Sequence, residues 1–228
     1  MPIKYSCFIS YPHVTQGRYW DRIMVHLKEE LENRLGPLVK ETVYIDAQNI
    51  NTGDDFEQAL AKAICKSVCM LVVFTPLYRS STYCLREFLA MQRVEEKRMV
   101  DLTKHGFKTQ SRMIIPIVIK GDPDEDLPNK IKEIDYFDLT KILLRGRLDT
   151  LEFATKFLKI AQSIYKHSRS IKALEKKGLT QDCDLAKLPT DEEASDFWGV
   201  ESAEEIDSSV PLSNEGKEIG FPLRTNSR

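Results

Sequence analysis

Short apolar runs alternate with segments of helical periodicity over most of the chain, and this alternation limits the fold more than any other feature. The run at residues 68–75 is apolar on both faces, as expected of a central strand. Because strands that alternate with helices form parallel sheets covered on both faces, the sequence predicts an α/β fold. The expected strands are residues 5–10, 43–45, 68–75, 113–119 and 136–139. The expected helices are residues 19–35, 56–64, 81–98 and 151–164.

The C-terminal part of the chain differs from the rest in charge. Residues 178–228 contain four basic and twelve acidic side chains, a net charge of −8, whereas the whole chain has a net charge of −2. Few apolar residues, no sustained period and many acidic side chains are typical of disorder. We therefore expect one folded domain over residues 1–170 and a disordered, acidic, low-complexity tail over residues 171–228. Phe197 and Trp198 could be docking anchors, although isolated apolar residues are common in solvated tails.

The five cysteines and the N-terminal sequence bear on compartment and partners. The cysteine number is odd, no Cys/His ligand spacing occurs, and four of the five lie in apolar runs. We therefore expect reduced core thiols and no metal site. The chain starts without a signal peptide, and its longest apolar stretch is too short to span a bilayer. With its small net charge, the sequence predicts a cytoplasmic protein without nucleic-acid or membrane partners.

Candidate binding residues follow the expected strands. Ligands of open parallel sheets bind outside the carboxyl ends of the strands. Ser10 and Tyr11 follow the first strand, the loop at residues 46–53 follows the second, and a helix carrying Tyr83 and Glu87 follows the third. The glycines form neither GxGxxG nor a P-loop, and no HExxH or Ser/His/Asp pattern is present. The sequence therefore does not favour a dehydrogenase, a P-loop NTPase or a zinc hydrolase.

Several segments, in order, resemble the TIR (Toll/interleukin-1 receptor) domain family. Residues 8–11 resemble its opening motif, and residues 43–46, Gly53 and residues 63–67 resemble its second strand, BB loop and following helix. Residues 78–88 resemble the family pattern Y-x-S-x-W-C-x-x-E-L, with Tyr83 in the tryptophan position. Residues 114–117 resemble the fourth strand, so that the likeness covers residues 3–165.

The resemblance implies a flavodoxin-like sheet of five parallel strands and two possible functions. Some members cleave NAD+ to nicotinamide and ADP-ribose or a cyclic ADP-ribose isomer, often in immune or antiviral signalling. In them NAD+ is the substrate and no cofactor is needed. Others are non-enzymatic adaptors that associate with further TIR domains, here through residues 46–53 and 81–96. A phosphotransfer receiver is disfavoured, because no paired acidic cluster follows the first strand.

The resemblance places Glu87 at the catalytic position, and the chemistry fits one carboxylate. A helical wheel puts Glu87 at the flank of an apolar face, with Tyr83 one turn earlier. Nicotinamide leaves NAD+ as a neutral molecule, so one carboxylate suffices to stabilise the ribose cation. We expect Ser10, Tyr11, Asp46 and Tyr83 to bind substrate, with Asp46 mainly fixing its loop. The simpler alternative is that Glu87 is a solvated helix residue.

Overall fold

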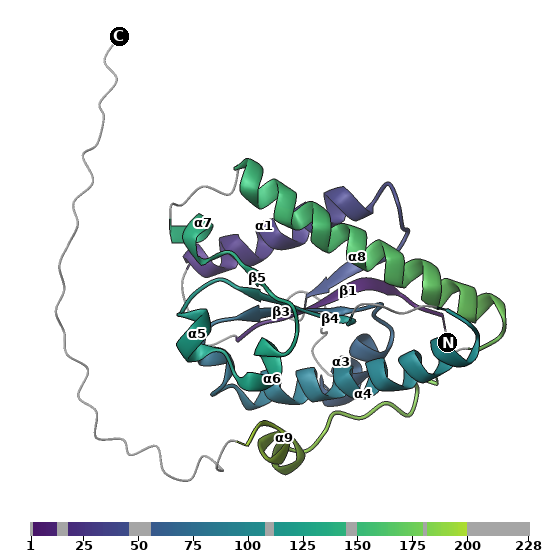
Figure 1. The fold of residues 1–228 in the computed structure, drawn as a ribbon. Helices are drawn as coiled ribbons and strands as arrows, with labels where there is room; N and C mark the ends of the chain where they lie inside the picture. The colour runs from purple at the N-terminus through teal and green to yellow at the C-terminus, as the bar shows by residue number, and fades with distance from the viewer. Residues whose placement is uncertain are drawn as a thin grey trace, which may run out of the picture.

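The chain forms a three-layer α/β structure, seen in a computed structural model (Figure 1). The structure describes residues 2–12, 18–45, 56–107, 112–144, 150–179 and 182–199. Asp46, Gly53 and the end of the expected tail, residues 200–228, lie outside the described residues.

The central layer is a sheet of five parallel strands in the order β2-β1-β3-β4-β5. This order is the flavodoxin-like one, which confirms the predicted fold class. The side chains of β3 are all buried, as its apolar sequence predicted. The strands are β1 (Tyr5–Ser10), β2 (Thr42–Ile45), β3 (Met70–Phe74), β4 (Ile114–Val118) and β5 (Phe137–Asp138).

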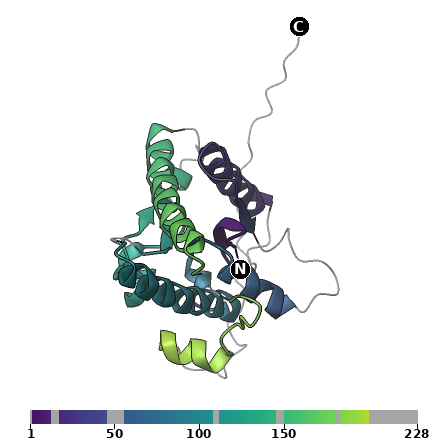
Figure 2. The ribbon, with the colours of Figure 1, turned by 90° about the vertical axis from the view of Figure 1, so that its right-hand side faces the viewer.

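Helices cover both faces of the sheet. Helices α1 (Arg18–Leu35) and α8 (Leu151–Lys176) lie on one face, whereas α3 (Phe56–Cys65) and α4 (Thr82–Lys104) lie on the other (Figures 1 and 2). Short elements complete the chain: η1 (Pro76–Tyr78), α5 (Pro123–Asp126), α6 (Asn129–Lys132), α7 (Thr140–Leu144) and α9 (Asp191–Trp198). Every predicted strand and helix is present, with ends shifted by a few residues or, for α4 and α8, extended further.

The start of α4 is fixed by a helix cap. The Ser81 hydroxyl accepts a hydrogen bond from the Cys84 backbone N–H at 3.4 Å, which satisfies one of the free donors of the first turn. The opposite half of α4 is held by Arg98, whose buried guanidinium donates to the carbonyl oxygens of Cys65, Ser67 and Val68. The cap fixes where α4 begins, and the Arg98 contacts fix its position against the segment that joins α3 to β3.

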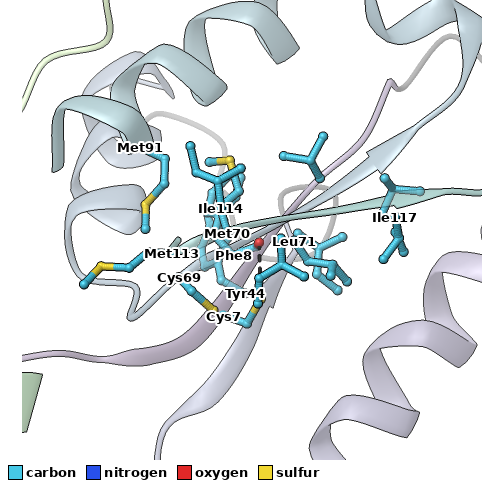
Figure 3. Close-up of a cluster of buried hydrophobic side chains, with 14 of the residues drawn as sticks. Cys7, Phe8, Tyr44, Cys69, Met70, Leu71, Met91, Met113, Ile114 and Ile117 are labelled. Carbon is cyan, nitrogen blue, oxygen red and sulfur yellow. Dashed lines mark hydrogen bonds between the residues drawn. The ribbon is translucent and has the colours of Figure 1, made fainter. Parts of the chain in front are cut away.

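The core lies between the sheet and its two helical layers. Figure 3 shows one part of it, where Phe8 of β1 stacks on Tyr44 of β2 with ring centroids 5.2 Å apart. Met91 of α4 packs over the same region, and the Cys7 and Cys69 thiols are buried there. The prediction of buried, reduced cysteines holds for Cys7 and Cys69, and also for Cys84.

The prediction of reduced cysteines is wrong for two residues. Cys65 at the end of α3 and Cys183 form a disulfide across 118 positions of sequence. Their Cα atoms are 5.7 Å apart because the chain after α8 returns along α3 and α4. Spacing along the sequence could not reveal this pairing, since it depends on tertiary structure.

The expected tail also begins later than residue 171. Helix α8 continues to Lys176, so the expected boundary falls within a helix. Residues 182–199 then pack on α4 and end in α9, which begins with a capping box between Thr190 and Glu193. The end of α8 is held by the buried apolar residues that recur at helical spacing there. Residues 182–199 are held by the aromatic pair Phe197-Trp198, which packs against the core.

Two classes of site are not found in the part of the chain that the structure describes. Its helices include none with the length and apolar character needed to cross a membrane. Among the same residues, no group of three or more His, Cys, Asp and Glu side chains could hold a metal ion.

Candidate functional site

Glu87 is buried, with 4% of its surface exposed, at the contact between α4 and the sheet. Ser10 Oγ, at the carboxyl end of β1, donates a hydrogen bond to Glu87 Oε2 at 2.5 Å. A buried carboxylate needs such donors, because burial removes it from water. Glu87 is therefore not the solvated helix residue of the simpler alternative. The carboxylate lies beside the carboxyl end of β1, and ligands of open parallel sheets bind outside the carboxyl ends of the strands.

Tyr78 of η1 completes a buried cluster with Ser10 and Glu87. Its hydroxyl lies 2.9 Å from Ser10 Oγ and donates to the Cys84 carbonyl oxygen at 3.1 Å. Burial, followed by the charges of Cys84 and Glu87, raises the pKa of Tyr78 well above its ordinary value, so the phenol stays protonated. The cluster joins β1, η1 and the first turns of α4 through buried side chains.

Tyr78 is a member of the cluster that sequence patterns did not single out for a role. The sequence feature that could have identified Tyr78 is its position as the first residue of the 78–88 pattern. Because the Ser10 proton is directed at Glu87, the Tyr78 proton is shared between Ser10 Oγ and the Cys84 carbonyl. Tyr78 therefore restricts the orientation of the Ser10 hydroxyl, and Ser10 restricts that of the Glu87 carboxylate.

Tyr83 lies one turn before Glu87 but on the surface, with 49% of its area exposed. The Phe56 ring at the start of α3 meets it edge-on, with centroids 5.8 Å apart. The Arg86 guanidinium lies 5.6 Å from its ring centroid. Tyr11 is partly buried and packs against the core next to Ser10. The structure thus brings Ser10 directly to Glu87, whereas Tyr83 belongs to the surface between α3 and α4.

Arg86, which sequence reasoning did not single out, is largely buried beside Glu87 in the sequence. Its guanidinium donates to the Pro189 carbonyl at 2.6 Å and to Glu57 Oε1 at 2.9 Å, and lies 3.3 Å from Asp191 Oδ1. The hydrogen bond to Glu57 and the nearby carboxylates raise the pKa of Arg86. A planar guanidinium suits such a site because it can reach several acceptors at once.

Two cavities lie further along α4. One of about 320 Å³ is lined by residues of α3, α4 and the 182–187 segment, including Ile64, Cys65 and Val94. Another of about 460 Å³ is lined by Glu96, Lys97, Val100, Asp101 and Asp182. Neither is lined by Glu87 or Ser10, so neither belongs to the candidate site.

Comparison with known proteins identifies the family. The family model of the TIR domain matches residues 7–151, well over half of the chain. The TIR domain of the Toll-related receptor TRR-2 from Hydra magnipapillata is 17% identical, with a TM-score of 0.45, over 70% of this chain and 99% of that chain. The TIR domains of the activated Roq1 resistosome, which directly recognizes the pathogen effector XopQ, are 20% identical, with a TM-score of 0.41, over 76% and 99%.

No curated protein matches the sequence, and the two structures are too distant to carry an argument about function. The match to the family model is long enough to assign the family. It runs from β1 to the start of α8 and includes Ser10, Tyr11, Asp46, Tyr83 and Glu87. The chain belongs to the TIR domain family.

Proposed function

We propose that the protein cleaves NAD+ to nicotinamide and ADP-ribose or a cyclic ADP-ribose isomer, with Glu87 as the catalytic carboxylate. The observation that carries the proposal is the buried Glu87 carboxylate, held by Ser10 at the carboxyl end of β1. NAD+ is the substrate, and no further cofactor enters the reaction. The proposal includes a role in immune or antiviral signalling and the cytoplasmic location expected from the sequence.

The proposed reaction breaks the bond between ribose C1 and the nicotinamide nitrogen. The bonding electron pair leaves with nicotinamide, which departs as a neutral molecule, and positive charge develops on the ribose. Glu87 faces that charge from a site of low dielectric, where electrostatic stabilisation is stronger than in water. Water then adds to C1 and loses a proton to give ADP-ribose, or a nucleophilic group of the same molecule adds to C1 instead and loses its proton to give the cyclic isomer.

The Ser10 hydroxyl supports this role by fixing the carboxylate before the substrate arrives. A carboxylate that needs no reorientation during the reaction stabilises a developing charge more effectively. Tyr11, Asp46 and Tyr83 are proposed to bind the substrate together with Ser10. Tyr83 suits a stacking role because its ring is half exposed, at the surface next to α3.

The low exposure of Glu87 adds a step to the mechanism. With 4% of its surface exposed, the carboxylate can meet a ribose only after a local rearrangement. Motions of this kind commonly precede the chemistry and can limit its rate. We propose that self-association, or association with other TIR domains, favours the open arrangement, so that turnover rises with protein concentration.

A non-enzymatic adaptor is the second candidate. The observation that favours it is the same cluster, because Ser10, Tyr78 and Glu87 also join β1 to α4 as a structural network. In that case Glu87 stabilises the fold, and the protein acts by association with other TIR domains.

The deciding experiment measures nicotinamide release from NAD+ by the purified full chain at high protein concentration. Glu87→Gln is the informative variant, because the Gln side-chain oxygen can still accept the hydrogen bond from Ser10 and keep the cluster connected. We expect a loss of at least ~100-fold in rate from removing this charge. Glu96→Gln is the matched control, since Glu96 is exposed on the same helix and bonded to Gln92.

The outcomes separate the two candidates. Turnover by the wild type and by Glu96→Gln, but not by Glu87→Gln, supports the enzyme. An absence of nicotinamide release from the assembled wild type contradicts it and leaves the adaptor. Equal turnover by wild type and Glu87→Gln would remove Glu87 from the mechanism.

A further inference from the structure

Residues 182–199, here called the C-terminal strap, run along α4 on the side away from the sheet (Figures 1 and 2). The strap is fastened covalently near its beginning, where Cys183 is bonded to Cys65 of α3. Both cysteines are buried. The strap therefore has a fixed starting point on the surface formed by α3 and α4.

The end of the strap is held by packing. The Trp198 ring meets Phe88 of α4 edge-on, with centroids 4.7 Å apart, and Phe197 packs at 6.2 Å from the same ring. The Lys130 ammonium lies 3.4 Å from the Phe197 centroid. Trp198 Nε1 also donates to the Leu85 carbonyl at 3.5 Å. Leu85 lies two residues before Glu87 and Phe88 directly after it, so α9 covers the helix turn that carries the candidate catalytic residue.

Arg86 connects the strap to the candidate site. Two of its partners, the Pro189 carbonyl and the Asp191 carboxylate, belong to the strap. Its third partner is Glu57 in the first turn of α3, which follows the loop expected to bind substrate. The same guanidinium lies over the Tyr83 ring. If the strap leaves, Arg86 loses two of its three acceptors, and Tyr83 and the start of α3 lose a common support.

Between Cys183 and Leu188 the strap buries little surface of its own. The cavity of about 320 Å³ lies beneath it, with Ile64 and Val94 among its apolar lining residues. Leu185, which lines the cavity from the strap, is 81% exposed. The disulfide is therefore the main attachment of the strap before Leu188. Because Cys65 also lines the cavity, a small thiol can approach the disulfide from there.

We propose that the strap is a redox-sensitive brace for the candidate site. With the Cys65–Cys183 bond closed, the strap holds Arg86, and through it Tyr83 and the start of α3, in the arrangement that binds NAD+. With the bond open, only non-covalent contacts, most of them made by an eight-residue helix, hold the strap, which is marginal for so short a helix. The brace then loosens and NAD+ binds more weakly. This inference rests on the proposed function.

The chemical step is thiol–disulfide exchange with a small thiol of the glutathione class. A thiolate attacks the sulfur of Cys65 or Cys183 and forms a mixed disulfide, and the other cysteine leaves as a thiolate that takes up a proton. A second small thiol then displaces the first from the protein. In total, the protein disulfide is reduced to two thiols while two small thiols are oxidised to one disulfide.

The first measurement follows the strap without using NAD+. Trp20 and Trp198 are the only tryptophans of the chain, so Trp20→Phe leaves Trp198 as the sole emitter. The oxidised full chain is compared with the same chain treated with dithiothreitol, and alkylation confirms that Cys65 and Cys183 are reduced. We expect the Trp198 emission to shift to longer wavelength on reduction. Backbone amides of residues 182–199 should exchange at least ~10-fold faster.

The second measurement compares NAD+ kinetics in the two redox states. Arg86 acts here as a positioning residue, so we expect KM for NAD+ to rise ~5-fold or more on reduction, with kcat changed by less than ~2-fold. Cys183→Ser should behave like the reduced chain and should not respond to dithiothreitol. Glu192→Gln is the matched control, because it removes an exposed charge from the same strap and should behave like the wild type.

Each outcome decides a separate point. Unchanged amide exchange and emission on reduction would overturn the brace. Faster exchange with unchanged KM would overturn the coupling between the strap and the site. An absence of NAD+ cleavage in every sample would contradict the proposed function and the coupling that rests on it, while the exchange rates would still decide whether the disulfide holds the strap.

Discussion

Ser10 and Glu87 lie 77 positions apart in the sequence and share a buried hydrogen bond of 2.5 Å between a hydroxyl and a carboxylate. The bond joins the carboxyl end of β1 to the second turn of α4. Such bonds are stronger than those between neutral groups, and leaving one partner unsatisfied in the interior is costly. The same contact therefore supports the fold and orients the group that we propose as catalytic.

Two substitutions of Glu87 should differ in stability. Glu87→Gln keeps an acceptor for the Ser10 hydroxyl and removes a buried charge, so we expect its free energy of unfolding to stay within ~1 kcal/mol of the wild type. Glu87→Ala removes the partner of Ser10 and leaves a void, with an expected loss of about 2 kcal/mol. Urea unfolding followed by circular dichroism measures both. A glutamine variant as unstable as the alanine variant would contradict the assigned cluster.

Ser10→Ala should lower activity more than stability. The variant leaves the Glu87 carboxylate without its fixed donor, so we expect NAD+ turnover to fall ~10-fold or more. The loss of stability should be about 1 kcal/mol, since the Tyr78 proton can still go to the Cys84 carbonyl. Nicotinamide release and urea unfolding are compared on the same samples. Ser80→Ala is a suitable control, because Ser80 makes an exposed local contact with Leu77. Full activity in Ser10→Ala would exclude the hydroxyl from the mechanism.

Tyr78→Phe tests whether the phenol acts through Ser10. The ring is fully buried and stays in place, but the Cys84 carbonyl and Ser10 both lose a donor. We expect a loss of about 1–2 kcal/mol in the free energy of unfolding. The double variant with Ser10→Ala should lose less than the sum of the two single losses, because the hydroxyls share one hydrogen bond. Additive losses in this cycle would show that the two groups act independently.

His167 should make the fold less stable in acid. Burial is the main cause that lowers the pKa of His167 below its ordinary value of 6.5, and the charges of Arg98 and Lys166 add to it. The folded state therefore binds fewer protons than the unfolded state between the two pKa values. The stability from neutral His167 is fully present above pH 6.5 and is lost as the pH falls through the lower, folded-state pKa.

The corresponding measurement is urea unfolding at several pH values for wild type and His167→Gln. We expect the wild-type free energy of unfolding to fall by up to about 1.4 kcal/mol per pH unit below pH 6.5. The variant should show a shallower slope in the same range. His105→Gln removes an exposed histidine and serves as the control. An unchanged slope in His167→Gln would assign the acid sensitivity to other groups.

Local patterns determined most of the fold. The fully apolar run that became β3 was predicted as a central strand because a strand buried on both faces must be apolar throughout. The helix that became α4 was likewise predicted, because its apolar residues recur at helical spacing over residues 81–98. These features depend on neighbours a few residues apart, so the sequence alone contains them. The family pattern at residues 78–88 likewise singled out Glu87.

Only the tertiary structure decided what Glu87 and the C-terminal strap contact. Ser10, Tyr78 and Glu87 come from β1, η1 and α4, and Arg86 meets Pro189 across 103 positions. Cys65 and Cys183 are further apart still, at 118 positions. The acidic composition of residues 182–199 predicted a loose tail because composition averages over the segment. Burial of this segment was decided by a few side chains, Cys183, Phe197 and Trp198, whose partners on α3 and α4 come within reach only when the sheet and its helices have assembled.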